Sequence, residues 1–61
     1  MNHEDKYVDE KYVSEFLGLA LATVRDMRFH SRGPGWHKFG RAVRYRLSEV
    51  RAWAEAQKVA A

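Results

Sequence analysis

The basic side chains of this chain gather in one segment, where they could bind a polyanion. Residues 25–46 hold seven Lys or Arg and one acid, a net charge of +6, whereas residues 1–24 carry −3 and residues 47–61 are neutral. A solvated surface is the commonest origin of a short charge run, but seven bases against one acid favour a nucleic-acid ligand. The segment therefore predicts an electrostatic contact with phosphates.

The residues give little indication of disulfides, metal binding or catalysis. The chain has no cysteine, so neither disulfides nor thiolate zinc sites can form. Its three histidines, His3, His30 and His37, lack the spacing of metal ligands. No Gly-rich phosphate loop, nucleophile elbow or pair of catalytic carboxylates occurs, and Gly33-Pro34-Gly35 is typical of a turn. We therefore expect no cofactor, no metal and no enzymatic activity.

The length of 61 residues predicts a single domain over residues 1–61, with 1–6 and 59–61 frayed. No apolar run approaches the roughly 20 residues of a membrane span, so no membrane partner is expected. The polar start, MNHEDKY, is unlike a signal peptide. These features are typical of a cytoplasmic protein.

Two short helices joined by a tight turn are predicted from caps and apolar spacing. Asp9 is suited to cap a helix over about residues 10–17, and Gly18 to end it. The apolar face of this helix is Val13, Phe16 and Leu17. A second helix is expected over about residues 21–30. Its core-facing residues are Ala20, Val24 and Met27. Such a pair is a helix-turn-helix motif.

After a loop over residues 31–35, the pattern predicts a β-hairpin whose register has two possibilities. Gly40 suits the first central position of a two-residue type II′ turn, which would pair Phe39 with Ala42. The apolar alternation favours Phe39 opposite Val43, across a three-residue loop. We favour the second register, because a slip of one residue would misplace a core face. In this register the residues on the core side of the hairpin are His37, Phe39, Val43 and Tyr45. The residues on its other side are Trp36, Lys38, Arg44 and Arg46.

A third helix is expected to follow the hairpin. Ser48 is suited to be its N-cap, with Glu49 in the first turn. Its buried face is Val50, Trp53 and Ala54. The fold class predicted is mainly α with a small β-hairpin, a winged helix-turn-helix of order α-α-β-β-α. The expected core is Val13, Phe16, Leu17, Leu19, Val24, Met27, Phe39, Val43, Tyr45, Val50 and Trp53.

The face of the second helix opposite the core is expected to enter the major groove of DNA. The predicted contacts on this helix are Ala22, Thr23, Arg25, Asp26, Arg28 and Phe29. Arg25 could bind guanine O6 and N7, and Asp26 could accept from a cytosine amino group or orient a neighbouring guanidinium. Ala22 and Phe29 could contact thymine methyls, and Thr23 a phosphate. As alternatives, Arg25 is solvated or paired with Asp26, and Phe29 packs in the core or against the hairpin.

The loop and hairpin add cations that could follow the DNA backbone. The predicted contacts there are Arg32, Lys38, Arg41, Arg44 and Arg46. Arg41 sits at the turn, where a wing reaches furthest into a groove or along phosphates. Trp36 could stack on a sugar, mediate self-association, or pack against the end of the second helix.

Several motifs between Tyr7 and Trp53 occur in the same order as in one known family of proteins. They are Tyr7-Val8-Asp9-Glu10, Glu15-Phe16-Leu17-Gly18-Leu19, Thr23-Val24-Arg25, Gly33-Pro34, Lys38-Phe39-Gly40-Arg41, Val43-Arg44-Tyr45-Arg46, Ser48-Glu49-Val50 and Trp53. This stretch resembles the MerR-like winged helix-turn-helix proteins of phages and mobile elements, which include AlpA-type regulators and excisionases. Ala20 departs from the family, which usually has Ser or Thr there to cap the second helix.

The resemblance implies sequence-specific binding of double-stranded DNA by a prokaryotic, nucleoid-associated protein. The leading expectation is an excisionase (recombination directionality factor) that binds repeated sites, self-associates on DNA and assists an integrase. A transcriptional regulator with the same DNA-reading surface is the alternative. A third possibility is a protein-interaction module whose basic face binds an acidic partner.

Overall fold

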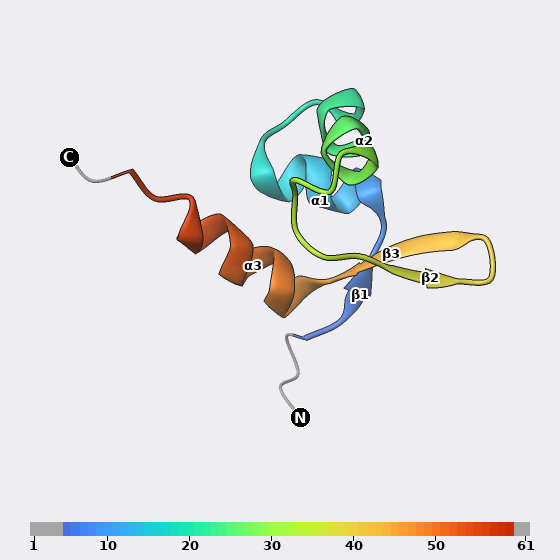
Figure 1. Ribbon diagram of the computed structural model, residues 1–61. Coiled ribbons are helices and arrows are strands. Elements are labelled where there is room, and N and C mark those ends of the chain that lie inside the picture. The colour runs from blue at the N-terminus through green and yellow to red at the C-terminus, as the bar shows by residue number, and fades with distance from the viewer. Residues whose placement is uncertain (1–4, 60–61) are drawn as a thin grey trace.

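The computed structural model describes residues 5–59, which form three helices and a three-stranded antiparallel sheet. In chain order the elements are β1 (Tyr7–Val8), α1 (Glu10–Leu17), α2 (Leu21–Phe29), β2 (His37–Phe39), β3 (Ala42–Arg46) and α3 (Leu47–Ala56). Figure 1 shows α1 and α2 together above the sheet, the β2–β3 hairpin projecting to one side and α3 leaving on the other. This is a mixed, helix-dominated fold consistent with a winged-helix arrangement, as predicted, with β1 as an unpredicted addition.

The helix-turn-helix forms as its local signals predict. Asp9 is extended and its side chain accepts the N–H of Tyr12 at 2.8 Å, which caps α1. Gly18 ends the helix in the left-handed region, with φ of 70°, a conformation that costs glycine little. Ala20, at the start of α2, makes no side-chain cap hydrogen bond. The helix ends at Phe29, one residue before its predicted end, and Ser31 then takes a positive φ of 53°.

The preferred hairpin register is wrong, and the alternative is confirmed. Phe39 pairs with Ala42, so Gly40 and Arg41 form a two-residue turn, and Gly40 has φ of 63°. Directly paired residues share a face of an antiparallel sheet. Lys38 therefore lies on the side of its partner Val43, not opposite it. The outward-facing residues of β2 and β3 are His37, Phe39, Ala42, Arg44 and Arg46.

The expected Ser48 cap is also wrong. Strand β3 runs directly into α3, and Arg46, at the N-cap position, makes no side-chain cap hydrogen bond. Ser48 lies inside the first turn, where its backbone N–H donates to Asp5 Oδ1 at 3.3 Å. The N–H of Leu47 donates to the carbonyl of Lys6 at 2.8 Å. Helix α3 is thus capped by a segment distant in the chain.

The fraying expected at the chain ends falls mainly on residues 1–4, 60 and 61, which lie outside the described residues. Asp5 and Lys6, also expected to fray, make the defined contacts with α3 given above. The backbone pairing of Tyr7 with Arg46 and of Val8 with Tyr45 holds the same segment against β3.

The core is built mainly from β-branched side chains. Its buried members are Val8, Val13, Val24, Tyr45, Leu47 and Val50. Half-buried Leu17, Met27 and Val43 pack against it, as the sequence predicts. Four expected core residues lie outside the buried cluster. They are Phe16, Leu19 and Phe39, which are exposed, and Trp53, which is half-buried.

The exposed aromatics find partners on the surface instead. Phe16 stacks with Tyr12 at 6.4 Å between ring centroids, and the Arg51 guanidinium lies over its ring at 5.9 Å. Phe39 packs edge-on against Tyr7 of β1 at 5.2 Å. Apolar spacing does not give the depth of a side chain, and for Phe39 the apolar alternation also indicated the wrong face of the sheet, so the spacing overestimated the core.

Candidate nucleic-acid interface

Helix α2 exposes the face that the sequence predicts. Val24 is buried and Met27 half-buried, whereas the predicted contact residues on the opposite side are open to solvent. These exposed residues are Ala22, Thr23, Arg25, Asp26 and Phe29. Ala20, expected to face the core, is exposed as well, and Leu21 is half-buried. The helix thus offers a mixed cationic, anionic and apolar surface.

Arg25 is paired with Glu10 of α1 and not with Asp26. Its Nε and Nη2 both lie 2.9 Å from Glu10 Oε1. Asp26 is instead associated with His30, whose Nδ1 lies 3.2 Å from Asp26 Oδ1. The hydrogen bond from Arg25 holds the pKa of the Glu10 carboxyl below its usual value against the opposing effect of burial, and the charges of Arg25 and Arg28 add to the decrease. Glu10 therefore carries a full negative charge beside α2 at neutral pH.

Arg28 is turned inward and not toward solvent. Its side chain is only 18% exposed, and Nη2 lies 3.5 Å from Glu10 Oε2. The guanidinium carbon lies over the rings of Phe29 at 5.2 Å and Trp36 at 5.6 Å. Trp36 thus packs against an α2 side chain, one of the roles considered for it. Arg28 links α1, α2 and the start of the hairpin.

The cations of the wing, which is the β2–β3 hairpin, and of the loop before it differ in exposure and in their contacts. Arg41 lies at the tip and is exposed. Arg44 is half-buried, and its Nη1 donates to the carbonyl of Val43 at 2.7 Å. Arg46 forms an ion pair with Asp5 at 2.8 Å at the base of the wing. Lys38 and Arg32 are exposed.

A cleft of about 740 Å³ brings cations from three elements together between α1, α2 and the wing. Its basic lining residues are Lys11, Arg25, Arg28, Arg41 and Arg44. Two acids, Asp9 and Glu10, also line it, but both are engaged within the fold, Asp9 as the α1 cap and Glu10 with arginines. The cleft keeps an excess of positive charge. Lys38, Arg32 and Arg46 are not among its lining residues.

Sequence reasoning missed Lys11 and Glu10 as members of this site. Both lie on α1, in the acidic N-terminal part of the chain, outside the basic segment of residues 25–46. The contact of Glu10 with Arg25 spans 15 positions of sequence. No local spacing pattern links residues that far apart, so only the packing of α1 against α2 reveals the pair.

The outward face of the sheet carries an aromatic cluster. Tyr7 of β1 lies edge-on to His37 at 5.3 Å and to Phe39 at 5.2 Å, across the central strand β3. His37 Nε2 also lies 2.9 Å from Glu49 Oε1 of α3. Tyr7 and Phe39 are about half exposed. A two-residue strand has too short an alternation to be recognised from sequence.

Within residues 5–59, no three His, Asp or Glu side chains group so as to hold a metal ion. No helix in that described part of the chain has both the length and the apolar content to cross a membrane. Comparison with models of known protein families finds no match, and comparison with curated proteins finds none either.

Proposed function

We propose that this chain is a sequence-specific binding protein for double-stranded DNA. The observation that carries the proposal is the cleft between α1, α2 and the wing, which gathers five cations from these elements. An α-helix with its side chains is about 10–12 Å across, close to the roughly 12 Å width of the major groove, so α2 (Leu21–Phe29) can enter it. In the proposed complex, α2 enters this groove and the wing follows the adjacent backbone.

The residues divide into base contacts and phosphate contacts in this proposal. The exposed face of α2 would read bases, with Arg25 as the principal hydrogen-bond donor. Arg41 at the wing tip would contact phosphates or a narrow minor groove. Arg44 and Lys11 line the same cleft, so their charges would act on the same stretch of backbone.

Selection of duplexes from a random pool at low salt tests the proposal. We expect enrichment of one motif, and weaker binding to a scrambled duplex of the same composition. Binding should weaken steeply as salt rises, because phosphate contacts release counterions. Failure to retard any duplex at low salt, together with stable binding to an acidic protein, would instead favour a protein-interaction module.

Within DNA binding, we propose the role of an excisionase that assists an integrase, with copies associating side by side on repeated sites. The support is the resemblance of the motifs between Tyr7 and Trp53 to that family. A purified integrase encoded beside this chain should excise its element faster when this protein is added. If excision is unaffected while a promoter carrying the selected motif responds, the chain is a transcriptional regulator.

A further inference from the structure

The carboxylate of Glu10 holds one edge of the Arg25 side chain. Oε1 accepts a hydrogen bond from Nε of Arg25 at 2.9 Å, and Nη2 of the same guanidinium lies 2.9 Å from Oε1 in an ion pair. A guanidinium carries five N–H groups, one on Nε and two on each terminal nitrogen. The contact with Glu10 occupies the side edge, formed by Nε and Nη2. The end edge, formed by Nη1 and the second hydrogen of Nη2, has no part in this contact.

Glu10 is itself fixed from two sides. Its other oxygen, Oε2, lies 3.5 Å from Nη2 of Arg28, which is one turn further along α2. The Glu10 side chain is 23% exposed, whereas that of Arg25 is 51% exposed. The covered carboxylate thus restricts the rotation of an arginine whose end remains in solvent.

The end edge of Arg25, which takes no part in the contact with Glu10, matches one base. It offers two parallel N–H groups, and guanine presents two acceptors, O6 and N7, in the major groove. Adenine presents one acceptor and one donor there, so it cannot accept from both groups. A phosphate also accepts two parallel N–H groups, but the negative charge of Glu10 beside the arginine opposes its approach.

We infer that Glu10 is a positioning residue that sets specificity, holding Arg25 so that its end edge reads a guanine and repelling phosphates that compete for it. This inference rests on the proposed DNA binding. The inferred role predicts two effects on DNA binding that a merely structural role of Glu10 would not produce. Removing the charge of Glu10 should weaken discrimination for guanine and, at the same time, strengthen binding to random DNA.

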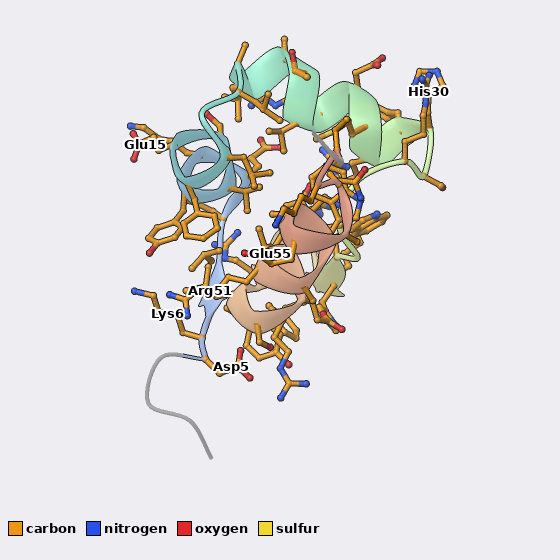
Figure 2. The ribbon with its side chains drawn as sticks, turned by 90° about the vertical axis from the view of Figure 1, so that its left-hand side faces the viewer. Asp5, Lys6, Glu15, His30, Arg51 and Glu55 are labelled. Carbon is orange, nitrogen blue, oxygen red and sulfur yellow. The ribbon has the colours of Figure 1, made fainter. Side chains whose placement is uncertain are left out.

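The test uses the duplex selected by the wild-type protein, with each guanine replaced in turn by 7-deazaguanine, which lacks the N7 acceptor. At one position we expect the wild-type affinity to fall about tenfold. Arg25→Ala should bind both duplexes equally. Glu10→Gln should lose less than about threefold at that position and bind scrambled DNA more tightly than the wild type. The matched control is Glu15→Gln, because Glu15 is an exposed acid on the same helix that points outward (Figure 2).

Glu10→Asp provides a second variant that keeps the charge but withdraws the carboxylate from Arg25. It should lose the guanine preference without the gain on scrambled DNA, and thermal melts of both variants verify folding.

A wild-type protein that selects no duplex would overturn the proposed function itself. If the wild type selects a duplex but Glu10→Gln or Glu10→Asp remains as sensitive to 7-deazaguanine as Glu15→Gln, the role of Glu10 is refuted. If Arg25→Ala binds every duplex more weakly by the same factor, Arg25 contacts a phosphate and not a guanine, and the proposed role of Glu10 is also refuted.

Discussion

The Arg46 guanidinium lies 2.8 Å from the Asp5 carboxylate, an ion pair between residues 41 positions apart. The other oxygen of Asp5 accepts from the backbone of Ser48 in the first turn of α3, and Figure 2 shows Asp5 beside the start of that helix. Burial raises the pKa of Asp5, but hydrogen bonds from Ser48 and Arg46 lower it more, so the net pKa lies below the usual 3.8. One carboxylate thus joins the wing to α3.

The first prediction follows from this lowered pKa. The stabilisation by Asp5 is complete above about pH 3.8, its ordinary value, and is lost as the pH falls through the lower folded value. Asp5→Asn should lower the Tm at neutral pH and reduce the further drop in Tm on acidification. Thermal melts by circular dichroism across a pH series measure both effects. In Glu15→Gln, which alters an exposed acid on α1, the acid-induced drop should match the wild type.

The second prediction concerns the hydroxyl of Tyr45, which is buried near the Arg28 side chain but makes no hydrogen bond of good geometry within residues 5–59. Leaving such a group unpaired costs about 1–3 kcal/mol. Tyr45→Phe should therefore leave the free energy of unfolding unchanged or raise it. Tyr45→Ala should lower it by about 3–5 kcal/mol, the cost of removing a large buried ring. Chemical denaturation measures both, and a clear loss in Tyr45→Phe would mean that the hydroxyl is hydrogen-bonded in solution.

The third prediction concerns Ser31, which follows α2 with a positive φ of 53°. An L side chain in this region is strained by about 1–2 kcal/mol, and glycine is preferred after a helix end. Ser31→Gly should raise the free energy of unfolding, by up to about 1 kcal/mol after the added chain entropy of glycine. Ser14→Gly, inside α1, should lower it by about 0.5 kcal/mol, because glycine is a poorer helix former than serine. Equal destabilisation by both changes would contradict the prediction.

The fourth prediction concerns Phe29, whose side chain is 76% exposed on the predicted DNA-reading face. Phe29→Ala should change the free energy of unfolding by less than about 0.5 kcal/mol, as surface substitutions usually do. It should weaken binding to the selected duplex if the ring contacts a thymine methyl. Replacing thymine by uracil should then weaken the wild type but not Phe29→Ala. A loss of stability with unchanged binding would assign the ring to packing alone.

The fifth prediction concerns Arg41 at the wing tip. Each phosphate contact contributes about 0.9 to the slope of log affinity against log salt. Arg41→Ala should reduce that slope by about this amount and weaken selected and scrambled duplexes alike. Lys58→Ala removes an exposed charge after α3 and should leave the slope nearly unchanged. An altered sequence preference in Arg41→Ala would indicate instead that the wing reads the shape of a narrow minor groove.

Several features of this protein follow from the sequence alone, because they depend on neighbours in the chain. The Asp9 cap and Gly18 define α1 within eight residues, and the exposed face of α2 follows from the spacing of Val24 and Met27. The concentration of positive charge in residues 25–46 is likewise visible without coordinates. Such signals act over one or two helical turns, where spacing and geometry are directly linked.

Tertiary structure decided the features that join distant segments. Strand β1 exists because β3 pairs with it, and it brings Tyr7 against the ring of the outward-facing Phe39. The structure also decided between the two hairpin registers that the sequence left open, in favour of the one that the Gly40 turn predicts. The pairing of Glu10 with Arg25 arose only when α1 packed against α2. These contacts depend on the relative placement of elements, and short-range spacing carries no information about that placement.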